Sequence, residues 1–245
     1  MSDIITIGVI GLGNAGAPIL NNLYKAEKYK LVAFDIDKNK LTDVPKDIIK
    51  ANSIEDLAEK CKVVLTCLPK PEHVLQAVDG ENGLLNNASS GMIWIDTSTT
   101  DFKQTQELSK KAKTYGVSML EATLTGGVHA LQNNNMVCLA GGDKEIFDNW
   151  KQVLQHAIGE VVVLCGDIGA GAIAKVVSNM LAFTNMVAAS ECMMIAKKAG
   201  LNLETFFDAI RVSAGNSFAW ETVIPHIFNQ KYESGFTMDL ACKDM

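Results

Sequence analysis

The chain has 245 residues, of which 48% are hydrophobic, and a formal net charge of −6. That length and apolar content provide for a sizeable core, in one large or two moderate domains. The 22 basic residues form no Lys/Arg block, which argues against nucleic acid or an anionic membrane surface as the main partner. The N-terminus enters an apolar run almost at once, so we expect no signal peptide.

A glycine-rich loop follows the first predicted strand. Residues 4–10 are apolar and largely β-branched, which predicts a buried strand, and residues 17–23 then favour a helix. Between them stand Gly11, Gly13 and Gly16, in G-x-G-x-x-G spacing. The first glycine allows a tight turn, the second lets backbone approach a pyrophosphate, and the third lets the helix pack closely on the strand. The phosphates would lie at the helix N-terminus, where unpaired N–H groups favour an anion.

A second predicted strand, residues 31–34, ends at Asp35. Asp35 follows the glycines at the sequence spacing at which an acidic residue of a dinucleotide-binding fold binds the ribose 2′-OH. The alternative is a glycine-rich turn with a surface aspartate, but the order of strand, glycines, helix, strand and acid is specific. Because the same carboxylate would repel a 2′-phosphate, we expect NAD rather than NADP, although Lys38 and Lys40 are near.

Strands and helices continue to alternate along the first two thirds of the chain. A short helix is expected from Ser53 as N-cap, with Asp56 at the capping-box position. Further strands are expected over residues 63–68, 92–95, 117–120, 136–140 and 161–164, and further helices over residues 72–78 and 102–115. This alternation predicts a mostly parallel, doubly wound sheet that helices cover on both faces.

The pattern changes after Gly166, where we place a domain boundary. Residues 168–198 carry no strand signal and have the small and apolar residues of one long buried helix, which Gly200 ends. Helices are also expected over residues 203–212 and 220–229. The sequence therefore predicts a Rossmann-type α/β domain over residues 1–165 and an all-helical domain over residues 166–245.

Ligands of an open α/β sheet bind outside the carboxyl ends of its strands. Besides the glycine loop, candidate positions follow the predicted strands at Leu68-Pro69, at residues 97–100 and at residues 121–127. In the last segment Thr125, Gly126 and Gly127 offer backbone N–H groups and a hydroxyl, a nest that suits a carboxylate. An ordinary glycine turn is the alternative.

Lys175 stands in an apolar stretch of the long predicted helix. Burying an unpaired ammonium is costly, and burial lowers a lysine pKa, as proton transfer near neutral pH requires. Asn179 follows four residues later on the same helical face. An acid/base with an orienting amide is one interpretation, and a lysine that snorkels to solvent at the helix edge is the other.

The remaining signals concern compartment, metal and membrane. The six cysteines have no C-x-x-C spacing and lie mostly in apolar runs, so we expect core residues in the cytoplasm or another reducing intracellular compartment. The four histidines lack metal-ligand spacing, and no metal is expected. Polar residues, Lys175 and Asn179 among them, interrupt the longest apolar stretch, residues 172–189, so no membrane span is expected.

Five motifs together resemble the β-hydroxyacid dehydrogenase family, which includes 3-hydroxyisobutyrate dehydrogenases. They are the glycine loop at residues 11–18, Asp96-Thr97-Ser98-Thr99, residues 121–127, the helical motif of Gly169, Gly171, Lys175 and Asn179, and Lys243-Asp244-Met245. The resemblance covers nearly the whole chain. It implies reversible hydride transfer between a nicotinamide cofactor and a small 3-hydroxy acid, or its semialdehyde, in a homo-oligomer.

The resemblance also implies roles for single residues. Lys175 is the general acid/base, and the small carboxylate substrate is held by Thr125, Gly126, Gly127 and Asn179. The cofactor is held by Gly11, Leu12, Gly13, Asn14, Ala15, Gly16, Asp35, Leu68, Pro69, Thr99 and Lys243.

The sequence departs from the family pattern at several positions. Thr123 and Thr125 replace the usual proline and serine, and Asn134 stands where glycine is frequent. Asparagine tolerates left-handed backbone better than other non-glycine residues, so that change is mild. Because relatives continue beyond the motif at Lys243, the helical domain is expected to be truncated at its C-terminal end. Two other interpretations stay open: a catalytically silent cofactor-binding or assembly module, and an enzyme similar to imine reductases, although the latter usually lack the lysine.

Overall fold

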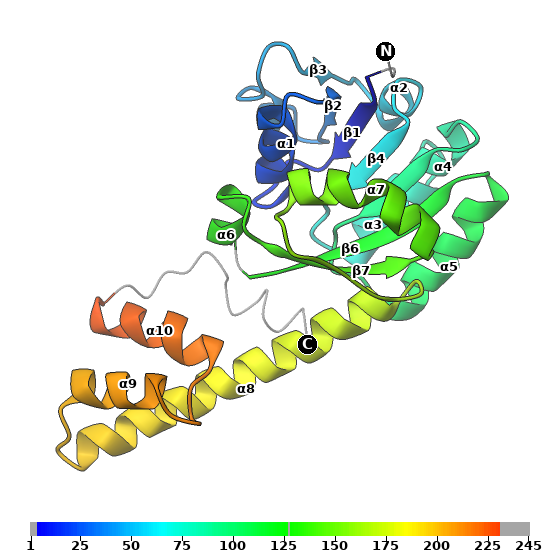
Figure 1. The fold of residues 1–245 in the computed structure, drawn as a ribbon. Coiled ribbons are helices and arrows are strands. Elements are labelled where there is room, and N and C mark those ends of the chain that lie inside the picture. The colour runs from blue at the N-terminus through cyan, green and yellow to red at the C-terminus, as the bar shows by residue number, and fades with distance from the viewer. Residues whose placement is uncertain (1–3, 127, 231–245) are drawn as a thin grey trace. The chain divides into compact units, whose positions relative to one another are not determined.

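One mixed sheet of eight strands organises the computed structural model, which describes residues 4–126 and 128–230. The strand order is β3-β2-β1-β4-β5-β6-β7-β8 (Figure 1). The strands are β1 (Thr6–Ile10), β2 (Lys30–Phe34), β3 (Ile49–Lys50), β4 (Val63–Thr66), β5 (Ile93–Asp96), β6 (Ser118–Thr125), β7 (Val137–Gly142) and β8 (Val162–Gly166). All neighbouring pairs are parallel except β6 and β7. The predicted mostly parallel, Rossmann-type sheet is confirmed.

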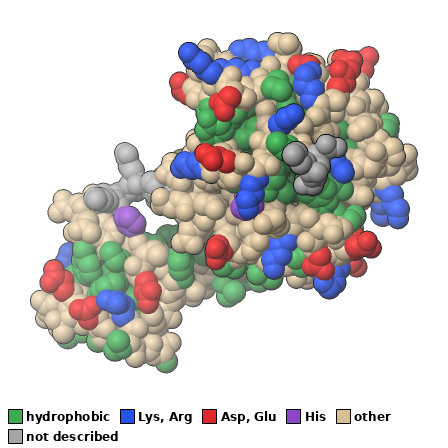
Figure 2. Space-filling model, turned by 45° about the horizontal axis from the view of Figure 1, so that its top comes forward, with side chains coloured by type: hydrophobic (Ala, Val, Ile, Leu, Met, Phe, Trp, Pro, Cys, Tyr) green, Lys and Arg blue, Asp and Glu red, His purple; other side chains and the backbone are tan. Residues whose placement is uncertain are grey.

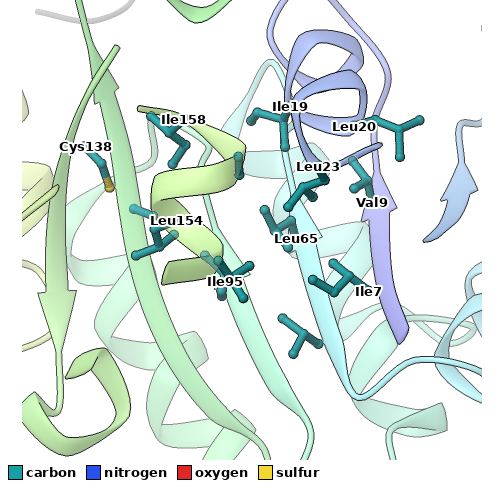
Figure 3. Close-up of a cluster of buried hydrophobic side chains, with 14 of the residues drawn as sticks. Ile7, Val9, Ile19, Leu20, Leu23, Leu65, Ile95, Cys138, Leu154 and Ile158 are labelled. Carbon is teal, nitrogen blue, oxygen red and sulfur yellow. The ribbon is translucent and has the colours of Figure 1, made fainter. Parts of the chain in front are cut away.

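Helices cover both faces of this sheet because its strands alternate apolar side chains between the two sides. One face packs against α1 (Gly16–Lys25), α6 (Val128–Gln132) and α7 (Lys144–Ala157). In Figure 3, Ile7, Leu65 and Ile95 of three neighbouring strands lie against Leu23 of α1 and Leu154 of α7. The other face packs against α2 (Ile54–Ala58), α3 (Pro71–Asp79), α4 (Leu84–Asn87) and α5 (Phe102–Thr114), and a single-turn 3₁₀ helix (Lys38–Leu41) follows β2.

Side-chain caps fix where several helices begin. Ser53 Oγ accepts the Asp56 N–H at 3.0 Å, as its predicted N-cap role requires, whereas the Asp56 carboxylate accepts the N–H of Asn52 rather than that of Ser53. Asp101 and Asp143 each accept two backbone N–H groups at the starts of α5 and α7. These caps orient the helices that follow the strand ends.

Beyond the sheet, α8 (Ala170–Lys198) is a single helix of 29 residues, as predicted, but the expectation that it is buried is wrong, because most of its side chains are exposed or only partly buried. The chain divides into compact units at residues 1–175 and 176–245, within α8, whereas the sequence interpretation places the boundary at Gly166. In the second unit, α9 (Leu203–Arg211) and α10 (Phe218–Phe228) share a small core with the C-terminal half of α8. Trp220 is its centre, stacked on Phe207 and edge-on to Phe206.

Two expectations from the sequence need correction. The strand predicted over residues 117–120 continues to Thr125, because Glu121 to Thr125 pair antiparallel with β7, so most of the expected loop is strand. Cys61 and Cys138 are buried as expected, but Cys165 and Cys192 are exposed, while Cys242 lies outside the described residues.

The surface shows two further features. On the face drawn in Figure 2, lysine and arginine side chains are interspersed with aspartate and glutamate. Among the described residues, α8 alone has the length and apolar composition of a membrane-crossing helix, and 17% of its most apolar 18-residue window is buried. Length and composition alone do not identify a membrane span.

Candidate cofactor and substrate site

The carboxyl ends of the parallel strands lie level with one another. Ile10 pairs with Phe34 and with Thr66, Thr66 pairs with Asp96, and Asp96 pairs with Glu121. The residues that follow these strand ends therefore gather at one edge of the sheet. They include the predicted cofactor residues Gly11, Asp35, Leu68, Pro69 and Thr99.

The glycine loop has the shape that a dinucleotide requires. Gly11 has φ +92, and a Cβ there would collide with the Cys67 carbonyl oxygen. A Cβ on Gly16 would collide with the Gly11 carbonyl oxygen, so this glycine lets α1 pack against the end of β1. Gly13 is exposed with no heavy atom near its Cβ position, which leaves room for a ligand to approach the backbone.

The start of α1 suits an anion. Its N-cap residue, Ala15, makes no side-chain hydrogen bond to the helix end, and its first turn holds no acidic residue. The positive end of the helix dipole is thus available to a phosphate group. A cavity of about 530 Å³ adjoins this helix end, lined by Leu12, Gly13, Asn14, Ala17, Pro18, Asp37, Asn39, Lys40, Asp43 and Gln132. The residues of this loop fit a dinucleotide cofactor.

Asp35 is held against the glycine loop. Its Oδ2 accepts the Leu12 N–H at 2.6 Å and its Oδ1 accepts the Asp37 N–H at 2.8 Å. An ionised carboxylate has about four acceptor positions, so two remain for ribose hydroxyls. Lys38 lies over the Phe34 ring and donates to the Asn52 carbonyl, whereas Lys40 lines the cavity.

A buried hydrogen-bond network joins the ends of β4 and β5. Asp96, 2% exposed, accepts from the Thr66 hydroxyl at 2.8 Å and from the Ser98 N–H at 3.0 Å. The Leu68 N–H donates to Ser98 Oγ, which ties the segment after β4 to the segment after β5. Burial raises the pKa of Asp96 from 3.8 to about 6, although these donors oppose the shift.

Sequence reasoning named Thr99 in this segment and missed the structural role of Asp96 and Ser98. The signal was present in the sequence, because an aspartate that ends an apolar strand needs donors if it is buried. Thr99 itself is half-buried at the same sheet edge.

Two residues of the predicted carboxylate nest, Thr125 and Gly126, lie at the C-terminal end of β6. Thr125 is the last residue of β6 and half-buried, and Gly126 is exposed with φ +124, a backbone conformation that favours glycine. The Thr123 hydroxyl donates to the carbonyls of Leu139 and Gly171, so this departure from the family pattern serves packing. Gly127 and Lys243 lie outside the described residues, and their predicted roles stay predictions.

Two polar residues of α8, Lys175 and Asn179, are buried. Lys175 is 8% exposed and Asn179 is 7% exposed, one turn apart on one helical face. Met180 and Leu181 on the same helix are 57% and 60% exposed. The Lys175 side chain is therefore largely enclosed by protein, which argues against the alternative of a lysine that snorkels into solvent.

No group of three or more His, Cys, Asp or Glu side chains that could hold a metal ion occurs in the described part of the chain. The candidate site described above consists of a dinucleotide loop, the predicted carboxylate-binding residues after β6 and a buried lysine. Together they define the class of NAD(P)-dependent oxidoreductases.

Two family models match consecutive parts of the chain. Residues 6–166 match the NAD-binding domain of 6-phosphogluconate dehydrogenase, and residues 169–245 match the NAD-binding domain of NADP-dependent 3-hydroxyisobutyrate dehydrogenase. NAD(P) binding is thereby established for both parts of the sequence, without a distinction between the two cofactors.

Individual relatives agree with these models. Mitochondrial 3-hydroxyisobutyrate dehydrogenase of Mus musculus is 30% identical over 100% of this chain and 75% of its own length. The 2-(hydroxymethyl)glutarate dehydrogenase of Eubacterium barkeri is 30% identical over 100% of this chain and 81% of its own length. A solved structure of Mycobacterium tuberculosis 3-hydroxyisobutyrate dehydrogenase with L-serine has a TM-score of 0.90 at 28% identity, covering 98% of this chain and 84% of that one.

The chain belongs to the β-hydroxyacid dehydrogenase family. The resemblance read from the five motifs is confirmed, as is the expected reaction class, NAD(P)-dependent oxidoreduction of a hydroxy acid.

Proposed function

We propose that the protein catalyses the reversible oxidation of a small 3-hydroxy acid to its semialdehyde, with NAD as cofactor and Lys175 as general acid/base. The observation that carries this proposal is the enclosed Lys175, which α8 holds one turn before Asn179. A bound nicotinamide supplies the hydride acceptor or donor, and the protein supplies position and proton transfer.

Residues of this chain transfer the proton, orient the substrate and bind its carboxylate. In oxidation, neutral Lys175 takes the hydroxyl proton of the substrate, and in reduction its ammonium returns a proton to the developing alkoxide. Asn179 orients the substrate or the lysine. Thr125, Gly126 and Gly127 bind the substrate carboxylate through the hydroxyl and backbone N–H groups.

The substrate class follows from what the relatives have in common. 3-Hydroxyisobutyrate and 2-(hydroxymethyl)glutarate, named in two of them, each carry a hydroxymethyl group on the carbon that bears the carboxylate. L-Serine, present in the solved structure of the third, has the same pattern with an amino substituent. We therefore propose 3-hydroxypropanoates substituted at carbon 2 as substrates.

NAD is the proposed cofactor because an acid in the position of Asp35 binds the ribose 2′-OH in dinucleotide-binding folds and would repel the 2′-phosphate of NADP. The Asp35 carboxylate is fixed by Leu12 and Asp37, and Lys38 is engaged by the Asn52 carbonyl. Comparing kcat/KM for NAD and NADP tests this choice. Asp35→Asn should lower the NAD-to-NADP ratio by about tenfold, which corresponds to about 1.4 kcal/mol. A wild-type preference for NADP would contradict it.

A substrate screen separates the proposed function from its alternatives. Purified protein is assayed with NAD(H) and NADP(H) against 2-substituted 3-hydroxypropanoates, their semialdehydes and cyclic imines. Turnover of the hydroxy acids supports the proposal, whereas reduction of imines alone points to an imine reductase. Cofactor binding without turnover of any of them points to a silent module.

Two proposals concern the protein's surroundings. The exposed apolar side of α8 suits a second copy of the chain, so we propose a homo-oligomer without nucleic-acid or membrane partners. All five described cysteines are free thiols, which supports the cytoplasm or another reducing intracellular compartment.

A further inference from the structure

The start of α8 is held by a single buried carboxylate. Glu121, on β6 and 2% exposed, accepts the N–H groups of Gly169 and Gly171 on Oε1, each at 2.7 Å. Its Oε2 accepts the Ala172 N–H at 3.3 Å. These are N–H groups that the first turn of a helix cannot satisfy internally. Glu121 thus caps α8 from a neighbouring strand.

Two glycines, Gly141 and Gly171, leave the space that this carboxylate occupies, and a third, Gly169, is required nearby for another reason. A Cβ on Gly141 of β7 would collide with Glu121 Oε1. A Cβ on Gly171 would lie 2.6 Å from the Leu139 carbonyl oxygen and 3.1 Å from Glu121 Cδ. Gly169 has φ +101, and its Cβ would collide with the Phe102 ring of α5. Close packing around Glu121 therefore explains Gly171 of the helical motif, whereas the positive φ and the Phe102 ring explain Gly169.

Burying the charged Glu121 carboxylate costs free energy, so filling space in the core is a poor explanation for a glutamate at this position. Burial raises its pKa, the nearby Asp96 adds to that shift, and the three backbone N–H groups oppose it. Cross-strand pairing places Asp96 directly opposite Glu121. The three backbone N–H groups stabilise the ionised carboxylate against this cost, through charge-assisted hydrogen bonds at the helix end.

Lys175 follows Gly171 by four residues, which is about one helical turn. The Thr123 hydroxyl donates to the Gly171 carbonyl and Gln106 donates to the Ile168 carbonyl, so contacts from β6 and α5 also reach this end of α8. Between Glu121 and Lys175 there is only rigid helix. A shift of the helix end would therefore move the lysine with it.

We propose that Glu121 is a positioning residue, which fixes the start of α8 and thereby sets the place of the Lys175 amine at the reacting oxygen. This inference rests on the acid/base role proposed for Lys175. Both Glu121 oxygens accept from backbone N–H groups of α8. In residues 121–127, we therefore assign a structural role to Glu121 and keep the substrate-binding role for Thr125.

The test compares Glu121→Gln and Glu121→Ala with a matched control, Asp143→Asn. Asp143 caps α7 by the same kind of hydrogen bonds, to the N–H groups of Glu145 and Ile146, but α7 carries no proposed catalytic residue. For each variant we would measure kcat, KM, the dissociation constant for NADH and the melting temperature. Glu121→Gln is also combined with Lys175→Ala.

Glu121→Gln should lower kcat by about tenfold to a hundredfold, since displacements near 1 Å have effects of that size, with NADH affinity unchanged within about twofold. Glu121→Ala should lower kcat further, because glutamine keeps an acceptor oxygen for Gly169 and Gly171. Asp143→Asn should lower the melting temperature and leave kcat unchanged. In the Lys175→Ala background, Glu121→Gln should cause no further loss.

A kcat of Glu121→Gln equal to that of wild type would overturn the inference. A loss of NADH affinity as large as the loss of kcat would also overturn it. So would a tenfold or larger further loss of kcat when Glu121→Gln is added to Lys175→Ala. If Glu121→Ala does not fold, Glu121→Gln and the double variant still decide the matter. Wild-type activity in Lys175→Ala alone would instead contradict the proposed function, so the two failures are distinguishable.

Discussion

Asp96 is a buried carboxyl group whose ionisation the fold opposes. Its pKa is raised from 3.8 to about 6 because the carboxylate is buried, and a raised pKa means that the folded state holds the proton more tightly. The stability that this group contributes is therefore present below pH 3.8 and is lost as the pH rises through about 6.

Asp96→Asn should remove this pH dependence. The amide oxygen can still accept from Thr66 and Ser98, so the variant should gain up to about 3 kcal/mol relative to wild type between pH 4 and pH 7. Urea unfolding at several pH values, with the exposed Asp148→Asn as control, measures the difference. A constant difference between Asp96→Asn and wild type across that range would contradict the assigned cause.

Thr125 offers a second prediction at the scale of one side chain. Thr125→Val keeps the shape of the side chain and removes the hydroxyl, and with it one hydrogen bond to the substrate carboxylate. The activation free energy that corresponds to kcat/KM for the hydroxy acid should therefore rise by about 1.5–3 kcal/mol, so kcat/KM should fall. NAD affinity should stay unchanged. Thr114→Val, on the exposed surface of α5, serves as the control. An equal fall in cofactor affinity would show that Thr125 does not face the substrate.

Single residues with a strong local requirement were the most predictable. Asn134 adopts φ +51, as expected for an asparagine where relatives have glycine, and Ser53 caps α2. The sequence places Glu121 in a candidate ligand-binding segment and does not indicate its contact with α8. The N–H groups that Glu121 accepts lie 48 to 51 positions away in the sequence. No local pattern reports such a contact.

Helix α8 is the element whose pattern was hardest to interpret. Its length is evident from the sequence, but its buried face carries Lys175 and Asn179 while Val177, Met180, Leu181 and Val187 are 49% to 60% exposed. Hydrophobicity ordinarily indicates which side of a helix is buried, and here that rule fails. Such an inversion is expected where a polar site and an apolar interface share one helix.

The exposed side of α8 leads to a prediction about assembly. If the protein forms the proposed homo-oligomer through this side, Leu181→Glu should convert it to monomer, because a buried interface does not tolerate an unpaired charge. Size-exclusion chromatography with light scattering measures the mass, and Lys197→Glu, near the polar end of the helix, is the control. A monomeric wild type, or a wild type that co-floats with lipid vesicles, would contradict a protein–protein interface.

Strand β7 shows where element order is not enough. Its residues have the same apolar character as the parallel strands, yet it runs antiparallel to β6. The connection between them, residues 126–136, is short of the dozen or more residues that a parallel crossover needs. Connection length, rather than composition, was the informative signal.

At the scale of the whole molecule, the strand order brings the glycine loop and the other predicted cofactor residues to one edge of the sheet. The alternation of strands and helices was sufficient to predict a dinucleotide-binding sheet, because each strand end is marked by glycine, proline or a polar residue. The sequence indicated that Asp96 needs donors if it is buried, but it did not identify the partners of Asp96 or of Glu121, because both carboxylates bond to groups far away in the sequence.

The most direct test of the central claim measures turnover of a 2-substituted 3-hydroxypropanoate with NAD in wild type, Lys175→Ala, Lys175→Arg and the control Lys197→Ala. We predict that both Lys175 variants lose about 10²–10⁴-fold in kcat and still bind NADH, because neither alanine nor guanidinium can exchange a proton near neutral pH. Lys197→Ala, on the exposed end of the same helix, should match wild type. Near-wild-type turnover by Lys175→Arg would contradict the account, since it would reduce Lys175 to an electrostatic anchor.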